Sequence, residues 1–126
     1  MNLRDKILAA NDIQTELVEV PEWDTIVEVR GMSGHDRARI LQAAADSEGS
    51  ISIGRLYAET VIAATYDPDT GERVFRDEDM DVLLSKAAAP MDRLASVGMR
   101  LARMEAGAGE AAKKQFPEES EPPIPV

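Results

Sequence analysis

The chain has 126 residues, enough for one domain with one hydrophobic core but not for a second domain of enzyme size. Its 24 acidic and 14 basic residues give a net charge of -10, which argues against nucleic acid and against anionic membrane surfaces as partners. Hydrophobic residues make up 44% and aromatic residues only 4%, and cysteine is absent, so we expect an aliphatic, helix-rich core without disulfides or thiolate sites.

The N-terminal half predicts a short helix, a hairpin and two further helices. Helical spacing predicts a helix over residues 3–11, and apolar residues in period two predict strands at 17–20 and 26–29 around a turn that holds Trp23. Ser33 with Asp36 resembles a capping box and predicts a helix to about Ala45. A further helix is predicted from Ile53 to Ala64, although the β-branched run Thr60-Val61-Ile62 argues against it.

The segment from Tyr66 to Glu72 predicts a tight turn, because Pro68 fixes φ and Gly71 accepts the left-handed conformation that closes a bulged hairpin. Asp77 is predicted to cap the next helix, with Lys86 in its last turn. Pro90 suits the first turn of a last helix that reaches Met104.

The fold class predicted from these elements is α+β, mostly α: a small helical domain over residues 1–106 with a short N-terminal β-hairpin. Residues 107–126 are rich in proline and glutamate and hold too little apolar surface to offset the cost of ordering, so a disordered acidic C-terminal tail is predicted there. The N-terminus has no signal-peptide pattern and no stretch is apolar enough to span a membrane, so we expect a cytoplasmic protein.

The sequence offers little material for catalysis. The one histidine, His35, precedes Asp36 in the first turn of a predicted helix, where neighbouring side chains point apart, and a polar surface residue is the favoured interpretation. Asp67, Asp69 and Glu78 occupy positions of a possible calcium loop, but Glu72 stands where that loop requires glycine. We therefore expect no catalytic site, metal or cofactor.

The last helix is the strongest candidate for a binding surface. Its apolar residues recur at helical spacing, and Met99 adds a methionine off that stripe. Flexible thioethers suit a surface that adapts to several apolar segments, whereas packing into the core is the default for a stripe of this kind. The partner-binding residues predicted from the sequence are Trp23, Met91, Leu94, Val97, Met99, Leu101 and Met104.

Short motifs in a fixed order give the chain a family resemblance over roughly residues 17–104. They are Val20-Pro21-Glu22-Trp23, Val27-Glu28-Val29-Arg30, Ser33-Gly34, Tyr66-Asp67-Pro68, Val74-Phe75, Asp77-Glu78-Asp79, Ser85-Lys86-Ala87-Ala88-Ala89 and Asp92-Arg93-Leu94. Together they resemble the small tail assembly chaperones of siphophages and related prophages. The segment Ser47 to Gly54 and the Pro-rich end depart from that pattern.

This resemblance implies a protein without enzymatic activity that acts in the host bacterial cytoplasm and is absent from the mature virion. Its partners would be the helical, hydrophobic tape measure protein, which it keeps soluble, and tail tube subunits, which it helps to recruit. The family also implies a longer form made by ribosomal frameshifting, for which the codons of Lys113-Lys114 are a candidate site. A homo-oligomer is left open. The alternative function is a structural tail completion or connector protein of the virion.

Overall fold

The computed structural model describes residues 2–104 of the chain. Its sheet begins with β1 (Thr15–Val20) and β2 (Thr25–Arg30), which pair antiparallel with Val18 opposite Val27. A 3-10 turn over Pro21–Trp23 joins them, and Asp24 closes it with a φ of 51°. Because side chains alternate across a strand, the buried valines all lie on one face, namely Val18, Val20, Val27 and Val29. The hairpin predicted from the sequence is confirmed.

Two helices follow the hairpin, as predicted. α2 (Gly34–Ala44) begins where the Ser33 hydroxyl accepts a hydrogen bond of 3.1 Å from the Asp36 backbone amide. α3 (Ile53–Ala64) packs against α2, α4 and α5, and every residue from Ala58 to Ala64 is buried. A central helix of a core is apolar on all sides, and this explains why packing overrides the weak helix propensity of Thr60, Val61 and Ile62.

A third strand was not predicted. β3 (Thr65–Tyr66) continues directly from α3 and adds to the other edge of β2, which gives a three-stranded sheet in the order β1-β2-β3. The tight turn after it is confirmed: Gly71 has a φ of 76°, and Tyr66 bridges to Arg73. Two residues carry no detectable strand pattern in the sequence, since their pairing depends on β2.

The predicted cap at Asp77 is wrong. The Asp79 carboxylate accepts a 2.8 Å hydrogen bond from the Arg76 amide, so a 3-10 turn over Asp77–Asp79 comes first and α4 (Met80–Leu84) follows. Asp77 instead lies 3.5 Å from Arg73 in an exposed ion pair. Lys86 lies beyond the end of α4 at Leu84, because Ser85 caps it.

The last helix, α5 (Ala88–Leu101), holds Pro90 in its first turn as predicted, but it ends before Met104. Arg103 turns the chain with a φ of 59°. The Arg103 amide donates to the Arg100 carbonyl at 3.1 Å and the Met104 amide donates to the Met99 carbonyl at 2.7 Å. These two bonds form a Schellman motif with an arginine in the position that normally holds glycine.

Replacing Arg103 with glycine is expected to stabilise the protein by about 0.5 to 1 kcal/mol, because glycine adopts positive φ without steric cost. The Arg103 side chain is exposed, so little packing is lost. Urea unfolding measures the gain, and Arg103→Ala, which keeps the strained φ, is the control. An Arg103→Gly variant no more stable than Arg103→Ala contradicts this account.

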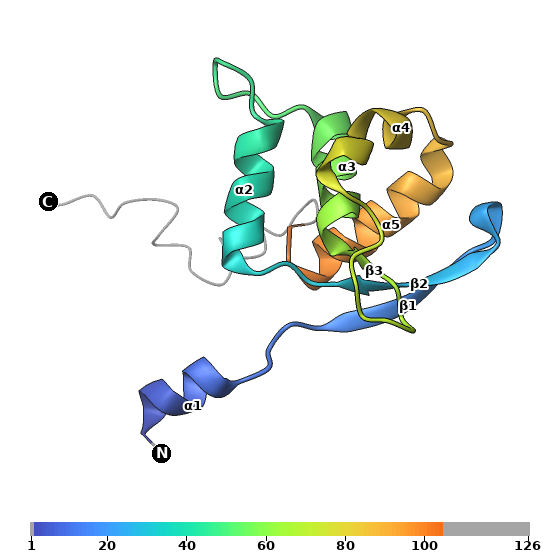
Figure 1. Cartoon of the computed structure of the whole chain (residues 1–126). Helices are drawn as coiled ribbons and strands as arrows, with labels where there is room; N and C mark the ends of the chain where they lie inside the picture. The colour runs from blue at the N-terminus through green and yellow to red at the C-terminus, as the bar shows by residue number, and fades with distance from the viewer. Residues whose placement is uncertain (1, 105–126) are drawn as a thin grey trace, which may run out of the picture.

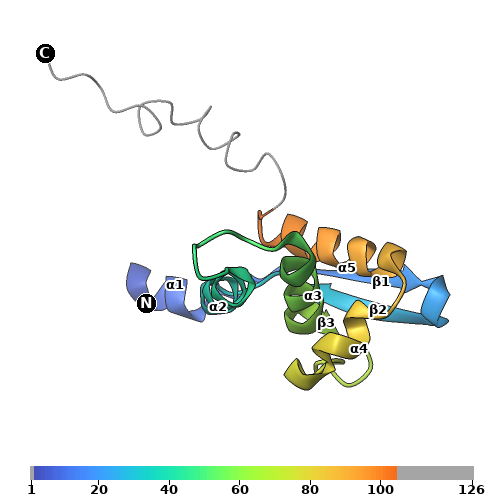
Figure 2. The same cartoon turned by 90° about the horizontal axis from the view of Figure 1, so that it is seen from above.

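The helices α2 to α5 lie on one face of the sheet and leave the other face bare, as Figures 1 and 2 show. The core between them consists of the strand valines, α3 and the buried side of α5. The short helix α1 (Leu3–Ala9) ends before the predicted residue 11, buries none of its residues and lies at the opposite end of the hairpin from its turn (Figure 1). No helix within residues 2–104 is long and apolar enough to cross a bilayer. The predicted tail, 107–126, lies outside the described residues.

Candidate functional site: an apolar groove on the hairpin

The structure places the predicted residues of α5 mostly in the core. Leu94 is 1% exposed, Met99 6% and Met91 7%. Val97 and Leu101 are partly buried against the same core, and Met104 is half-buried beyond the helix end. Met99 therefore belongs to the buried side of α5, contrary to its predicted position off the stripe. Partner binding through these residues stays a prediction, since in this conformation Met91 and Leu94 belong to the hydrophobic core and Met99 is also buried.

Trp23 has a different environment at the hairpin turn. Its ring is partly buried and meets the ring of Phe75 edge to face, with centroids 6.3 Å apart and planes at 75°. Trp23, Phe75, Val74 and Ile26 line a cavity of about 370 Å³ together with Val27, Thr25 and the residues 67–69. An aromatic pair that lines a small, mostly apolar cavity is suited to contact with another apolar side chain.

A larger hollow lies on the bare face of the sheet next to this cavity. It has a volume of about 700 Å³, and we call it the hairpin groove; its lining residues are Leu17, Glu19, Pro21, Asp24, Thr25, Ile26, Pro68 and Asp69. Leu17 is 64% exposed and Ile26 is 50% exposed, although both belong to strands. The two hollows share Thr25, Ile26, Pro68 and Asp69 and so form one surface.

The charge around the groove has one sign. Its lining includes the carboxylates of Glu19, Asp24 and Asp69 and no basic side chain. An apolar floor with an acidic rim favours a segment that carries apolar side chains flanked by lysine or arginine.

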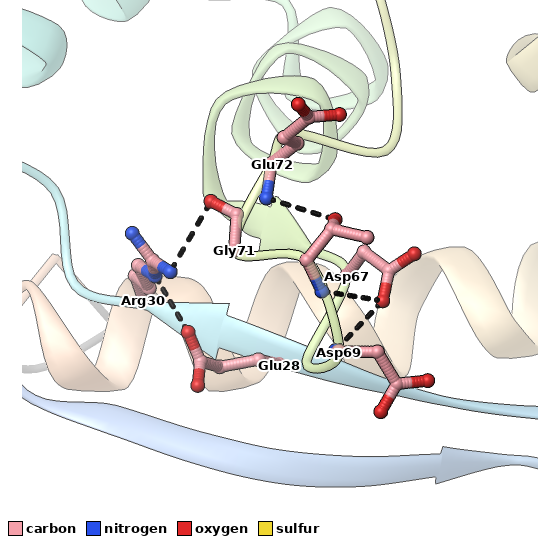
Figure 3. A network of polar contacts seen from close by, with 7 residues as sticks. Glu28, Arg30, Asp67, Asp69, Gly71 and Glu72 are labelled. Atoms are coloured by element: carbon pink, nitrogen blue, oxygen red, sulfur yellow. Dashed lines mark hydrogen bonds and ion pairs between the residues drawn. The ribbon is translucent and has the colours of Figure 1, made fainter.

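A network of polar contacts holds one wall of the groove in place (Figure 3). The Asp67 carboxylate accepts from the amides of Asp69 at 2.8 Å and Thr70 at 3.4 Å, which fixes the turn that presents Pro68 and Asp69. Arg30, on the bare face of β2, donates to Glu28 at 2.6 Å and to the Gly71 carbonyl at 3.5 Å. The Arg30 guanidinium also lies 3.9 Å from the centre of the Tyr66 ring.

Ion pairs tie the hairpin to α5 on the other face. Arg93 donates to both carboxylate oxygens of Glu22 at 2.7 and 2.8 Å, and Arg100 donates to both oxygens of Glu16 at 2.7 and 2.9 Å. The hydrogen bonds from Arg93 are the main cause that lowers the pKa of Glu22 to about 2. The bidentate geometry fixes the hairpin turn, and with it Pro21 and Trp23, relative to the helices.

The Glu22 pair predicts a pH dependence of stability. A carboxyl group whose pKa is lowered by folding stabilises the native state above its unfolded pKa, and this contribution is lost as the pH falls through the folded value. We therefore expect the loss to begin near the ordinary glutamate pKa and to be complete below about pH 2. Urea unfolding across this range measures it. A Glu22→Gln variant with the same acid dependence as the unchanged protein contradicts the prediction.

The residues that the sequence offered as candidates for catalysis or metal binding lie at the surface and have ordinary structural roles. Within residues 2–104, no group of three or more histidine, cysteine, aspartate or glutamate residues could hold a metal ion. The Asp67 carboxylate of the calcium-loop alternative serves the turn, and His35 is exposed in the first turn of α2. What the hairpin groove can do is bind an apolar segment.

Sequence reasoning identified Trp23 but missed the groove beside it. The sequence feature that could have revealed the groove is the outward position of Leu17 and Ile26, in strands whose opposite face consists of valines. That pattern alone does not show that helices cover the valine face only, or that the turn at Pro68 folds over the hairpin.

The fold is similar to that of a solved phage protein. No family model matches the sequence, and no curated protein does. Among solved structures, the chain is similar to the tail assembly chaperone of bacteriophage HK97, with a TM-score of 0.54 and 20% sequence identity over 78% of this chain and 95% of that one. The similarity agrees with the resemblance carried by the sequence motifs. The chain therefore has the fold of a phage tail assembly chaperone.

Proposed function

We propose that this protein is a phage tail assembly chaperone that binds apolar helical segments of the tape measure protein in the hairpin groove and keeps them soluble. In this role it acts in the host bacterial cytoplasm, helps to recruit tail tube subunits, and is absent from the mature virion. The observation that carries the proposal is an exposed apolar surface built on a rigid hairpin, with Leu17 and Ile26 beside Trp23, in a groove whose charged lining residues are all acidic.

The physical argument is one of complementarity. A strand pair about 20 Å long offers a track for between three and four turns of helix, since six residues extend about 3.4 Å each and a helix rises about 5.4 Å per turn. Apolar side chains along one helix face would fill the hollow, and basic residues beside them would meet Glu19, Asp24 and Asp69. The large net negative charge keeps such complexes dispersed.

Co-expression with the tape measure protein of the same phage tests the proposal. We expect the tape measure protein to move from the insoluble to the soluble fraction and to co-purify with this chain. A tape measure protein that is equally insoluble with and without the chain contradicts the proposal. Mass spectrometry of purified virions tests the alternative, because a completion or connector protein would be found there in stoichiometric amount.

The apolar residues of α5 remain a second proposed contact with the tape measure protein. Binding through Met91, Leu94 and Met99 requires α5 to move away from α3, which hydrogen exchange of α5 amides would reveal when the tape measure protein is added. The frameshifted longer form is also a proposal, and Lys113-Lys114 lies outside the described residues. Codons without a slippery run at this dipeptide would exclude it.

A further inference from the structure

The carboxylates that line the hairpin groove differ from the other carboxylates of the hairpin. Three hairpin carboxylates lie outside the groove, and each forms an ion pair with an arginine: Glu16 with Arg100, Glu22 with Arg93 and Glu28 with Arg30. The three that line the groove form no ion pair within residues 2–104: Glu19, Asp24 and Asp69. The groove thus combines an exposed apolar floor with negative charge that no cation of the described part of the chain offsets.

One segment later in the sequence has the complementary chemistry. Lys113 and Lys114 are the only basic residues after Arg103, and Phe116, the only aromatic residue after Phe75, follows two positions later. A large apolar side chain next to two cations matches an apolar floor bordered by carboxylates. Ile124 is a poorer match, because it stands between two prolines and has no basic residue beside it.

This segment is close enough along the chain to reach the groove of its own molecule. α5 ends beside the open end of the hairpin, since a Cβ atom on Gly31 would lie 3.2 Å from the Leu101 carbonyl oxygen. The groove lies on the opposite face of the sheet from α5, along a strand pair about 20 Å long (Figures 1 and 2). The 12 residues from Met104 to Phe116 span up to about 40 Å when extended, which is enough to pass around the sheet.

We propose that residues 113–116 bind in the hairpin groove of the same molecule, with Phe116 on Leu17 and Ile26 and the two lysines among the carboxylates of the groove. The contact covers the apolar floor until an apolar client displaces the segment. This consequence for the client rests on the proposed function, whereas the contact itself does not.

A pair of introduced cysteines reports the contact directly, because the chain has no cysteine of its own. In the full chain, Thr25→Cys places a thiol at the groove and Gln115→Cys places one beside Phe116, and the proposed contact residues stay unchanged. The matched control is Val82→Cys/Gln115→Cys, since Val82 lies on α4 and is 58% exposed. We expect the intramolecular disulfide to form at least about tenfold faster in the groove pair, because a docked segment raises the effective concentration of one thiol at the other. Equal rates overturn the proposal.

Charge reversal separates a specific contact from random collision of the two thiols. In the groove pair, Lys113→Glu/Lys114→Glu should lower the rate to that of the α4 control, and adding Glu19→Lys/Asp69→Lys should restore it. Ile124→Ser, which removes the other candidate side chain, should leave the rate unchanged. A rate that does not respond to the lysine substitutions, or that responds to Ile124→Ser instead, overturns the proposal.

Mixing the two single-cysteine variants tests whether the contact is made within one molecule. Thr25→Cys chains and Gln115→Cys chains should form few mixed disulfides at concentrations where the double variant reacts fully. A mixed disulfide that forms as fast as the intramolecular one overturns the proposal.

The effect on the client is measured separately, by isothermal titration with an apolar helical segment of the tape measure protein. Lys113→Glu/Lys114→Glu/Phe116→Ser should raise the affinity about threefold or more, because an occupied groove lowers the apparent affinity in proportion to the fraction of free sites. An unchanged affinity overturns the competition. If the groove disulfide forms preferentially but the tape measure protein stays insoluble in co-expression, the proposed function fails and the contact stands. If the tape measure protein becomes soluble but the groove pair reacts like the α4 control, the contact fails and the proposed function stands.

Discussion

Replacing Gly98 with leucine is expected to destabilise the domain by about 3 kcal/mol or more, at the upper end of the cost of overpacking a core. A Cβ atom at this position would lie 3.0 Å from Cγ2 of Thr60, 3.4 Å from Cβ of Ala64 and 3.7 Å from Cγ1 of Val29. All three neighbours are almost completely buried. Gly98 is thus a point of close approach between α5, α3 and the sheet, and a leucine side chain has no space there.

The Thr60 side chain cannot easily rotate to make room for the leucine in such a variant. Its hydroxyl donates to the Leu56 carbonyl at 2.8 Å, so turning its methyl group away from α5 gives up a buried hydrogen bond. The matched control is Gly54→Leu, the same substitution in a helix where nothing lies within 4 Å of the added Cβ. Urea unfolding of both variants measures the difference. Equal stability of Gly98→Leu and Gly54→Leu would show that α5 packs less closely than described.

The second large effect concerns binding. In the double variant Leu17→Lys/Ile26→Lys we expect the affinity for an apolar helical segment of the tape measure protein to fall at least about a hundredfold, because two apolar side chains each contribute about 1.5 to 3 kcal/mol when buried. The fold should persist. Both positions are at least half exposed, and each new lysine would stand opposite a glutamate, Glu28 or Glu19, on the neighbouring strand.

The control for this variant removes apolar surface elsewhere. Val82 and Leu84 on α4 are 58% and 52% exposed, comparable to the groove residues, and lie outside the groove. Val82→Lys/Leu84→Lys should leave the affinity unchanged. Isothermal titration with the tape measure segment measures both variants. An equal loss of affinity in the two double variants would show that binding depends on the general hydrophobicity of the surface and not on the groove.

The sequence by itself determined the elements that local chemistry encodes. The alternation of valines fixed the hairpin, Ser33 fixed the start of α2, and Pro68 with Gly71 fixed the tight turn. These signals are strong because each acts within a few residues of the structure it sets. The same locality explains why Asp77 was wrongly predicted as the helix cap. Asp77 and Asp79 are both close enough in sequence to cap the turn, and it is the Asp79 carboxylate that accepts the hydrogen bond from the Arg76 amide.

Only the tertiary structure decided what is core and what is surface. A helical stripe such as Met91, Leu94 and Val97 has the same spacing whether it faces a partner or its own sheet, and the close approach at Gly98 determines that most of it is buried. β3 exists because β2 presents an edge to it. The groove arises because the helices cover one face of the hairpin and the Pro68 turn folds over the other, an arrangement between distant segments that no local pattern records.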